Sequence, residues 1–295
     1  MRNIVKFLII LFILSISKSF AAENTAKFLE TDWTFKGLFG KFDRASLQRG
    51  FQVYKEVCAS CHSMQYLSYR NLGEPGGPEF SEQEVKAIAA SFEIEDGPDS
   101  QGEMFTRPGK PSDKFKSPYP NTQAATAANG GAYPPDMSVL VKARKGGANY
   151  IYSVLVGYED PPPGVTLDDG VYYNKYMAGN KIKMPNNLMD GLVEYADGTE
   201  PTVDQMAKDV TTFLAWAAEP ELEERHRTGV KVIIYLVLLT TLVYLSMIIT
   251  VGISMIILTT VESFKNIFLS PQIKNVIYYL LSVFLVTVFQ WALGG

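Results

Sequence analysis

The chain has 295 residues, of which 47% are hydrophobic and 20% charged, and its formal net charge is −4. This length can hold one soluble domain with a sizeable core together with membrane segments. The chain is mildly acidic and has no basic stripe interleaved with aromatic residues, so we expect no nucleic-acid partner.

The first residues match an export signal. Two basic residues precede an apolar run over residues 7–16, and small residues follow at Ser19 and Ala21. This is the pattern of a cleaved signal peptide, and the apolar run is short for a membrane span. We therefore predict a signal peptide over residues 1–21, with cleavage after Ala22 as the alternative.

The pentapeptide 58–62 is the most informative segment of the chain. It matches the C-x-x-C-H pattern, in which Cys58 and Cys61 form thioethers to one haem and His62 becomes an axial ligand of the iron. The chain has no other cysteine, and its only other histidine is His226, so a zinc site would lack ligands. We predict one covalent haem c, with a structural disulfide in an exported protein as the alternative.

The soluble part, residues 22–228, is predicted to be a mostly α-helical extracytoplasmic domain with long loops. Apolar residues at helical spacing over 47–54 lead directly into the haem motif. Capping boxes at 81–84 and 202–205 are expected to begin two further helices. Small c-type cytochromes cross a helix before the motif with one near the C-terminus, and segments 47–54 and 202–217 suit those parts. Two stretches rich in glycine, proline and asparagine are too long for simple connectors: 105–136 and 157–191.

The second axial ligand is expected to be a methionine, because His226 lies beside a membrane segment. Methionines in predicted loops are Met104, Met137, Met177, Met184 and Met189. Pro185 follows Met184 and favours an extended backbone there. Spacing therefore favours Met184, ahead of Met177 and Met189, although each of these side chains could instead fill a gap in the core.

Residues 74–103 form an acidic stretch with Lys86 as its only cation. Its carboxylates are Glu74, Glu79, Glu82, Glu84, Glu93, Glu95, Asp96, Asp99 and Glu103. A patch of this kind would steer a basic partner and raise its association rate more than its affinity. A solvated acidic face without a partner is the alternative.

The composition changes after Arg227. No charged residue occurs over 232–261, a run longer than the about 20 residues that a span requires, so we predict a transmembrane anchor at 229–260. A short connecting loop at 261–275 is expected to lead to a second apolar segment at 276–295, for which a second transmembrane helix is predicted. A buried core helix is the alternative for either run.

Basic residues beside the first span conflict with the export signal. Arg225, Arg227 and Lys231 lie on the side that a signal peptide places outside, whereas the positive-inside rule would place them in the cytoplasm. Because covalent haem attachment also requires an outside location, we follow the signal. The expected location is a bacterial inner membrane, or its equivalent, with the haem domain on the periplasmic side.

On these motifs the chain resembles the cytochrome c1 family, the haem subunits of the quinol–cytochrome c oxidoreductase (respiratory complex III). The resemblance covers about residues 33–247. The stretches that carry it are 58–64, 66–72, 107–110, 127–136, 157–162 and 184–185.

The resemblance implies a class I c-type cytochrome-like haem domain followed by a membrane helix. It implies a redox subunit that takes one electron from a Rieske-type iron–sulfur protein and passes it to a basic c-type cytochrome, alongside a cytochrome b subunit. No separate catalytic residues are needed, because the chemistry belongs to the iron. The alternative is a free-standing membrane-anchored c-type cytochrome or a haem sensor.

Site residues also follow from the resemblance. Met184 matches the family's ligand methionine, and Arg107 matches the arginine that lies beside a haem propionate, where its charge would neutralise a carboxylate. A solvated loop arginine is the alternative for Arg107. The C-terminus departs from the family pattern of one anchor and a short basic tail. Either a genuine extra helix or a change of coding frame near Met247 would explain this departure.

Overall fold

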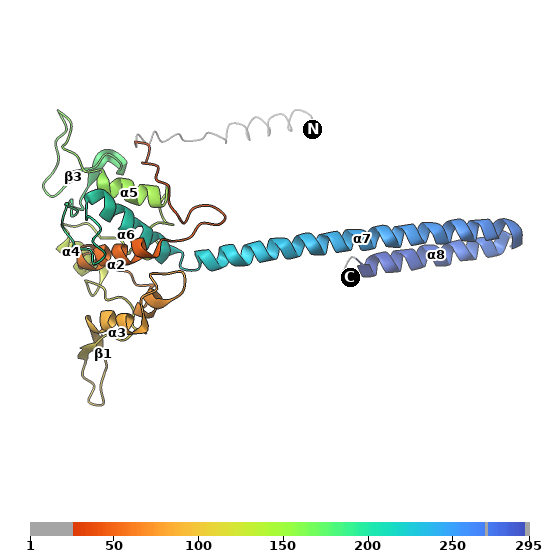
Figure 1. The fold of residues 1–295 in the computed structure, drawn as a ribbon, viewed down its shortest axis with the longest axis horizontal. Coiled ribbons are helices and arrows are strands. Elements are labelled where there is room, and N and C mark those ends of the chain that lie inside the picture. Colours follow the sequence, from red (N-terminus) through yellow and green to blue (C-terminus); the bar gives the residue numbers. More distant parts are fainter. Residues whose placement is uncertain (1–25, 269–270, 293–295) are drawn as a thin grey trace, which may run out of the picture. The chain divides into compact units, whose positions relative to one another are not determined.

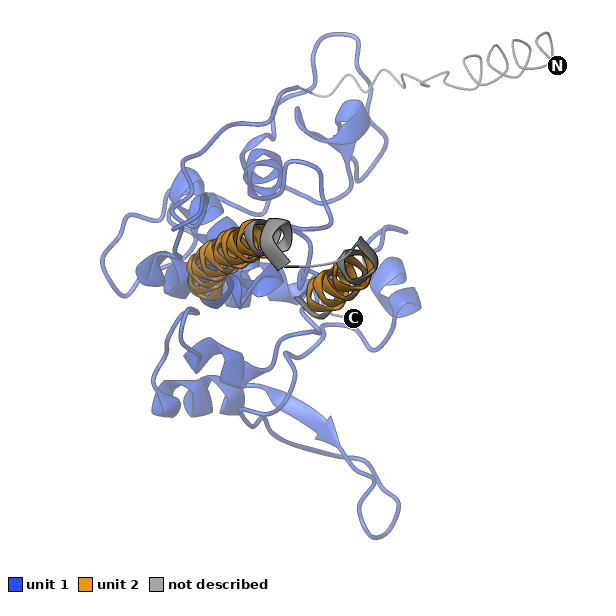
Figure 2. Cartoon of the chain, turned by 90° about the vertical axis from the view of Figure 1, so that its right-hand side faces the viewer, with its two compact units in different colours: residues 1–226 blue, residues 227–295 orange. Residues whose placement is uncertain are grey.

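The computed structural model describes residues 26–268 and 271–292, and the chain divides into two compact units (Figure 2). The first unit ends at His226 and the second begins at Arg227. The predicted signal peptide at 1–21 lies outside the described residues.

The first unit is built from short helices joined by long irregular segments (Figure 1). Its α-helices are α2 (Arg44–Glu56), α3 (Glu82–Ala90), α4 (Thr122–Ala128), α5 (Ala148–Val156) and α6 (Val203–Ala218). Its 3₁₀ turns are η1 (Cys58–Ser60), η2 (Tyr69–Gly73) and η3 (Ala178–Asn180). Two small antiparallel sheets pair β1 (Glu93–Asp96) with β2 (Phe105–Pro108), and β3 (Tyr172–Tyr173) with β4 (Lys181–Ile182). The predicted mostly helical class with long loops is confirmed.

Side-chain caps mark where α2, α3 and α6 begin, and the sequence predicts the last two of these starts. Ser81 and Glu84 form the reciprocal capping box at the start of α3. At the start of α6 the Thr202 hydroxyl accepts from the backbone N–H of Gln205 at 3.1 Å. The predicted reciprocal half of this capping box is not made, because the Gln205 side chain donates to Asp209 at 3.0 Å instead. For α2 the cap is Asp43, whose carboxylate accepts from the Ala45 N–H at 3.0 Å. Each cap satisfies an N–H group that has no partner inside its helix.

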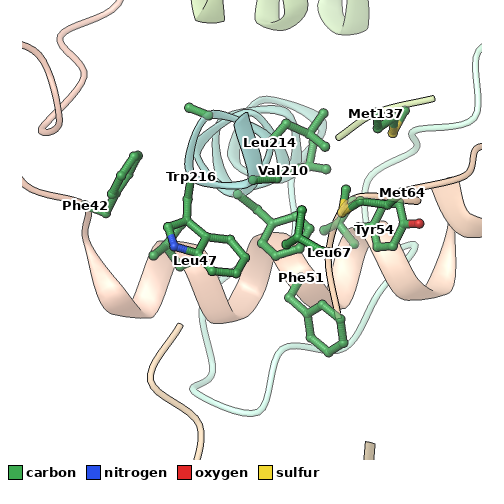
Figure 3. Packing of buried hydrophobic residues seen from close by; sticks show 14 of the residues in the cluster. Phe42, Leu47, Phe51, Tyr54, Met64, Leu67, Met137, Val210, Leu214 and Trp216 are labelled. Atoms are coloured by element: carbon green, nitrogen blue, oxygen red, sulfur yellow. The ribbon is translucent and has the colours of Figure 1, made fainter. Parts of the chain in front are cut away.

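The core of the first unit lies where α2 crosses α6 (Figure 3). At the crossing a Cβ placed on Gly50 would lie only 2.1 Å from the backbone oxygen of Asp209. Aromatic rings close the space beside this contact: the Phe213 ring lies 5.7 Å from those of both Phe51 and Tyr54. Glycine at position 50 therefore permits the two helices to approach backbone to backbone.

A buried ion pair joins the same two helices. The Asp209 side chain is fully buried, and its carboxylate accepts from Arg49 Nε at 2.8 Å and from the Ser46 hydroxyl at 2.7 Å. Arg49 also pairs with Asp197 at 2.7 Å. A buried carboxylate without these donors would be very costly, so the pair fixes the register of α2 on α6.

The apolar C-terminal helices belong to the second unit, apart from residues 222–226 at the start of the first of them. Helix α7 runs over Leu222–Phe268, and Leu222–Val261 is long and apolar enough to cross a membrane. Its most apolar 18 residues have a mean hydropathy of 2.6, and none of them is buried. The predicted transmembrane anchor is thus supported. Helix α8 runs over Pro271–Ala292, so the predicted connecting loop at 261–275 is largely helical. Proline is well accommodated in a first helical turn and does not enforce a long loop before α8.

The second predicted span stays a prediction. The apolar part of α8 that the structure describes covers Asn275–Gln290, which is shorter than the about 20 residues of a full span.

We predict that Gly50→Ala destabilises the first unit by about 3 kcal/mol, because the added methyl group meets the Asp209 backbone and the helices must separate. Thermal unfolding of the full chain in detergent would measure this loss. The matched control is Gly229→Ala, where a Cβ meets nothing within 4 Å and alanine suits a helix better than glycine. Equal melting temperatures for the two variants would contradict the role of Gly50.

Candidate haem-binding cavity

The first unit contains a cavity of about 470 Å³, a size typical of small-molecule and cofactor sites. The haem motif, the segment 128–137, helices α5 and α6, and the segment 182–187 all contribute to its walls. Most lining side chains are apolar, with Val210 and Leu214 contributed by α6. The cavity therefore lies against the same helix that packs on α2.

The haem motif forms one wall because the backbone turns immediately after α2. The N–H groups of Cys61 and His62 both donate to the Cys58 carbonyl, at 3.1 and 2.9 Å. This tight turn brings Cys58, Cys61 and His62 together among the lining residues. Both cysteines are free thiols rather than a disulfide. Burial, with a smaller contribution from Cys61, raises the pKa of Cys58 to about 12, so this thiol is protonated at neutral pH.

The His62 ring is held in the tautomer that a metal ligand requires. Its Nδ1 lies 2.8 Å from the Pro135 carbonyl oxygen, which can only accept, so Nδ1 carries the proton. The other ring nitrogen, Nε2, then keeps its lone pair, and a bond of this kind typically orients histidine ligands. The side chain is 8% exposed, and burial lowers its pKa, which favours the neutral imidazole.

Asp136 fixes the segment behind the histidine. Its carboxylate accepts from the Ser63 hydroxyl at 2.8 Å, the Gln65 N–H at 2.9 Å and the Ser138 N–H at 2.9 Å. The Met137 N–H donates to the Ser63 carbonyl at 2.8 Å. The sequence alone gave no role to Pro135 or Asp136, because their contacts cross about seventy positions of chain.

The methionines separate clearly in the structure. Met184 lines the cavity, and its carbonyl accepts from the Tyr158 hydroxyl at 2.9 Å, which fixes the backbone before Pro185. Met177 also lines the cavity, but its sulfur accepts from the Tyr150 hydroxyl at 3.4 Å. Met189 is 62% exposed and lies outside the lining.

Two of the other methionines weighed from the sequence are poorer candidates for the second ligand. Met137 lines the cavity, but its backbone N–H is bonded to Ser63, next to His62, so it lies on the same side as the histidine. Met104 is 56% exposed. Met184 is therefore the methionine best placed to face the cavity with a free thioether.

Arg107 is not among the residues that line this cavity. It lies on β2, where its guanidinium binds Asp113 through two bonds of 2.6 and 3.0 Å and also pairs with Asp96. The two carboxylates explain the position of Arg107. Its bidentate pair with Asp113 holds the guanidinium beside the hairpin of β1 and β2 (residues 93–108), which we call the acidic hairpin.

The charged side chains that line the cavity are Arg144 and Lys183, and the sequence analysis singled out neither. Arg144 belongs to a basic cluster over 142–145 that follows an apolar stretch. That cluster is a visible signal, but spacing does not say which of its members faces inward. The cavity offers these two cations to the carboxylates of a bound group.

These residues fit a covalently held haem. One wall offers two thiols and an imidazole with a free Nε2, another offers the Met184 thioether, and the rest is chiefly apolar with two cations. This donor set matches the histidine and methionine ligation of electron-transfer haems.

Comparisons with known proteins agree with this chemistry. The model of the Cytochrome C1 family matches residues 33–250. Cytochrome b/c1 of Bradyrhizobium diazoefficiens is 49% identical over 253 residues, which are 79% of this chain and 37% of that protein. Cytochrome c1 of Rhodospirillum rubrum is 48% identical over 75% of this chain and 86% of its own length. The mitochondrial heme protein cytochrome c1-2 of Solanum tuberosum is 56% identical over 68% of this chain and 75% of its own length.

Because Arg107 pairs with Asp113, we predict that the Asp113 carboxylate stays ionised at unusually low pH. Hydrogen bonding to Arg107 lowers the pKa of Asp113 from 3.8 to about 2. A depressed folded-state pKa means that the pair stabilises the hairpin above about pH 3.8 and is lost as the pH falls through about 2. Carboxyl NMR of Asp113 would show the midpoint near 2, moving up toward 3.8 in Arg107→Gln. An unchanged midpoint in that variant would contradict the pairing.

Proposed function

The chain belongs to the cytochrome c1 family, and from that premise we propose that it is the electron-transfer subunit of a quinol–cytochrome c oxidoreductase. Family members carry one covalently bound haem c. The observation that supports the proposal best is the cavity in which Cys58, Cys61, His62 and Met184 meet as lining residues. The chain spans 37% of the length of the Bradyrhizobium cytochrome b/c1 that it matches, so the activity of the whole assembly is part of the proposal.

The protein residues have distinct roles around the cofactor. Cys58 and Cys61 would hold it through thioethers, and His62 and Met184 would coordinate its iron. Pro135 keeps the imidazole oriented, and the Tyr158 bond holds the backbone at Met184. Arg144 and Lys183 would offset the charges of its carboxylates. When bound, such a haem supplies a one-electron couple, so no independent acid–base or nucleophilic site is needed.

We propose a Rieske-type iron–sulfur protein as the electron donor and a cytochrome b subunit as the neighbour in the membrane. The apolar helix α7 provides the membrane anchor. The signal-like residues at 1–21 and the requirements of covalent haem attachment support a haem unit on the periplasmic side of a bacterial inner membrane.

The acidic hairpin supports a basic c-type cytochrome as the acceptor. Glu93 and Glu95 alternate on β1 with exposed side chains, whereas Asp96 is engaged by Arg107 and Asp99 accepts from backbone N–H groups in the turn. Glu93 and Glu95 are therefore the members of this group best placed to act on a partner through their field. Exposed charges act within a Debye length of about 8 Å at physiological salt.

Replacing Met184 tests its assignment as a ligand of the iron. We predict that Met184→Leu lowers the midpoint potential sharply and changes the low-spin spectrum, because a thioether ligand raises the potential of the haem. The matched control, Met177→Leu, removes a sulfur that already accepts from Tyr150 and should leave both properties unchanged. A changed potential in the control, with none in the Met184 variant, would show that the other methionine is the ligand.

Charge reversal on the hairpin tests the acceptor. We predict that Glu93→Lys with Glu95→Lys slows reduction of a basic c-type cytochrome several-fold at low salt and flattens the salt dependence of the rate. Stopped-flow spectroscopy of the holoprotein would measure both effects, while quinol-side reduction of the haem stays intact. The matched control reverses two exposed carboxylates elsewhere, Glu194→Lys with Glu200→Lys, for the same change in net charge. Equal effects from the two pairs would place docking on another surface.

A further inference from the structure

We propose that the turn at 36–41 is a second membrane contact, in which Leu38 and Phe39 insert into the interfacial region of the bilayer beside the start of α7. Lys36 and Lys41 flank these two residues with exposed side chains and would meet lipid phosphates. The proposal goes beyond electron transfer and does not depend on the donor or acceptor. It rests on the exposure, the rigidity and the position of the turn.

Exposure is the first argument. The side chain of Phe39 is 77% exposed and that of Leu38 is 57% exposed. Phe39 has the highest exposed fraction among the large exposed hydrophobic residues of the chain that the structure describes. Two adjacent apolar side chains at the tip of a turn, bracketed by lysines, have the composition of an interfacial anchor rather than of a solvated loop.

Rigidity is the second argument. Backbone bonds close the turn: the Gly40 N–H donates to the Gly37 carbonyl at 3.2 Å, and the Lys41 N–H donates to the Thr34 carbonyl at 3.0 Å. A Cβ on Gly40 would lie 2.3 Å from the Phe35 backbone oxygen, so this tight path requires glycine.

The base of the turn is also firmly packed. The buried Phe35 ring lies 5.6 Å from that of Trp33 and 5.0 Å from that of Phe42. Backbone hydrogen bonds and packed aromatic rings therefore hold Leu38 and Phe39 in exposed positions.

Position is the third argument. The turn is tied to the first residues of α7: Gly40 O lies 3.4 Å from His226 Nδ1, and the Phe42 N–H donates to the Glu223 carboxylate at 2.9 Å. Arg44 holds the same carboxylate through two bonds of 2.8 and 2.9 Å.

The spacing along α7 relates these contacts to the bilayer. His226 precedes the charge-free run that begins at Val232 by about 9 Å of helix, at about 1.5 Å for each residue. The headgroup region on one side of a bilayer is roughly 5–8 Å thick. Measured along the helix, His226 thus precedes the apolar run by about one headgroup layer, a separation short enough for apolar side chains bonded nearby to reach the interfacial region.

A single spin label measures whether the turn meets lipid. In the haem-loaded full chain Cys58 and Cys61 are consumed as thioethers, so Phe39→Cys carries the only free thiol. The labelled chain is placed in vesicles of phosphatidylcholine and phosphatidylglycerol, and collisions with oxygen and with a water-soluble nickel chelate are measured by power saturation. We expect oxygen collisions to dominate at position 39, with nickel accessibility several-fold lower than at a labelled Met104→Cys in the acidic hairpin.

Met104 is a suitable control because its side chain is 56% exposed and its segment carries no link to α7 among the hydrogen bonds and ion pairs described. Leu38→Cys serves as a second reporter if the Phe39 variant fails to take up haem, which its absorption spectrum shows. Nickel accessibility at 38 and 39 equal to that at 104 would mean a solvated turn and would overturn the proposal. Low accessibility to both reagents would mean a protein contact and would also overturn it.

Discussion

The close approach of α2 and α6 at Gly50 is the constraint on which the haem-binding unit depends. It leaves no room for a side chain between the Gly50 position and the Asp209 backbone, and the buried carboxylate of Asp209 locks the helices in one register. Both helices lead to residues that line the cavity, so their contact also fixes the cavity. Cys58 follows α2 within two residues, and Val210, next to Asp209, lines the cavity. A shift of one helix on the other would therefore move the haem motif relative to the part of the cavity wall that α6 forms.

Much of the rest of the wall comes from long loops, and two of the bonds that hold them run from a side chain to a backbone carbonyl. The ring of His62 binds Pro135, and the hydroxyl of Tyr158 binds Met184. Each such bond involves only two residues, and together they position the two proposed ligands, His62 and Met184, without regular secondary structure around them. They also satisfy polar groups that burial would otherwise leave unpaired. The long loops are thus structural parts of the cavity and not merely connections between helices.

The sequence was informative where the signal was local. The starts of α3 and α6 and the apolar anchor each depend on consecutive residues, and each lies where the sequence predicts it, although only α3 has the full capping box. The haem motif is equally local, and its residues line the cavity. The sequence was uninformative where contacts join distant segments. Arg107 pairs with two carboxylates, whereas Arg144 lines the cavity, and nothing in the spacing of either residue distinguishes them. Met184 could be favoured from Pro185, but the Tyr150 bond that occupies Met177 requires three-dimensional information.

The length of α7 has a consequence for where the chain can reside. Its charge-free stretch at 232–261 corresponds to about 45 Å of helix, whereas the hydrocarbon core of a typical bilayer is about 30 Å thick. This hydrophobic mismatch is relieved by tilting the helix or by thickening the surrounding lipid, at a cost that grows with every ångström. Thick bilayers therefore accommodate the anchor with less tilt than thin ones. The thickness of the bilayer, which depends on its lipid composition, therefore favours some membranes over others as a location for this chain, independently of any protein that binds it.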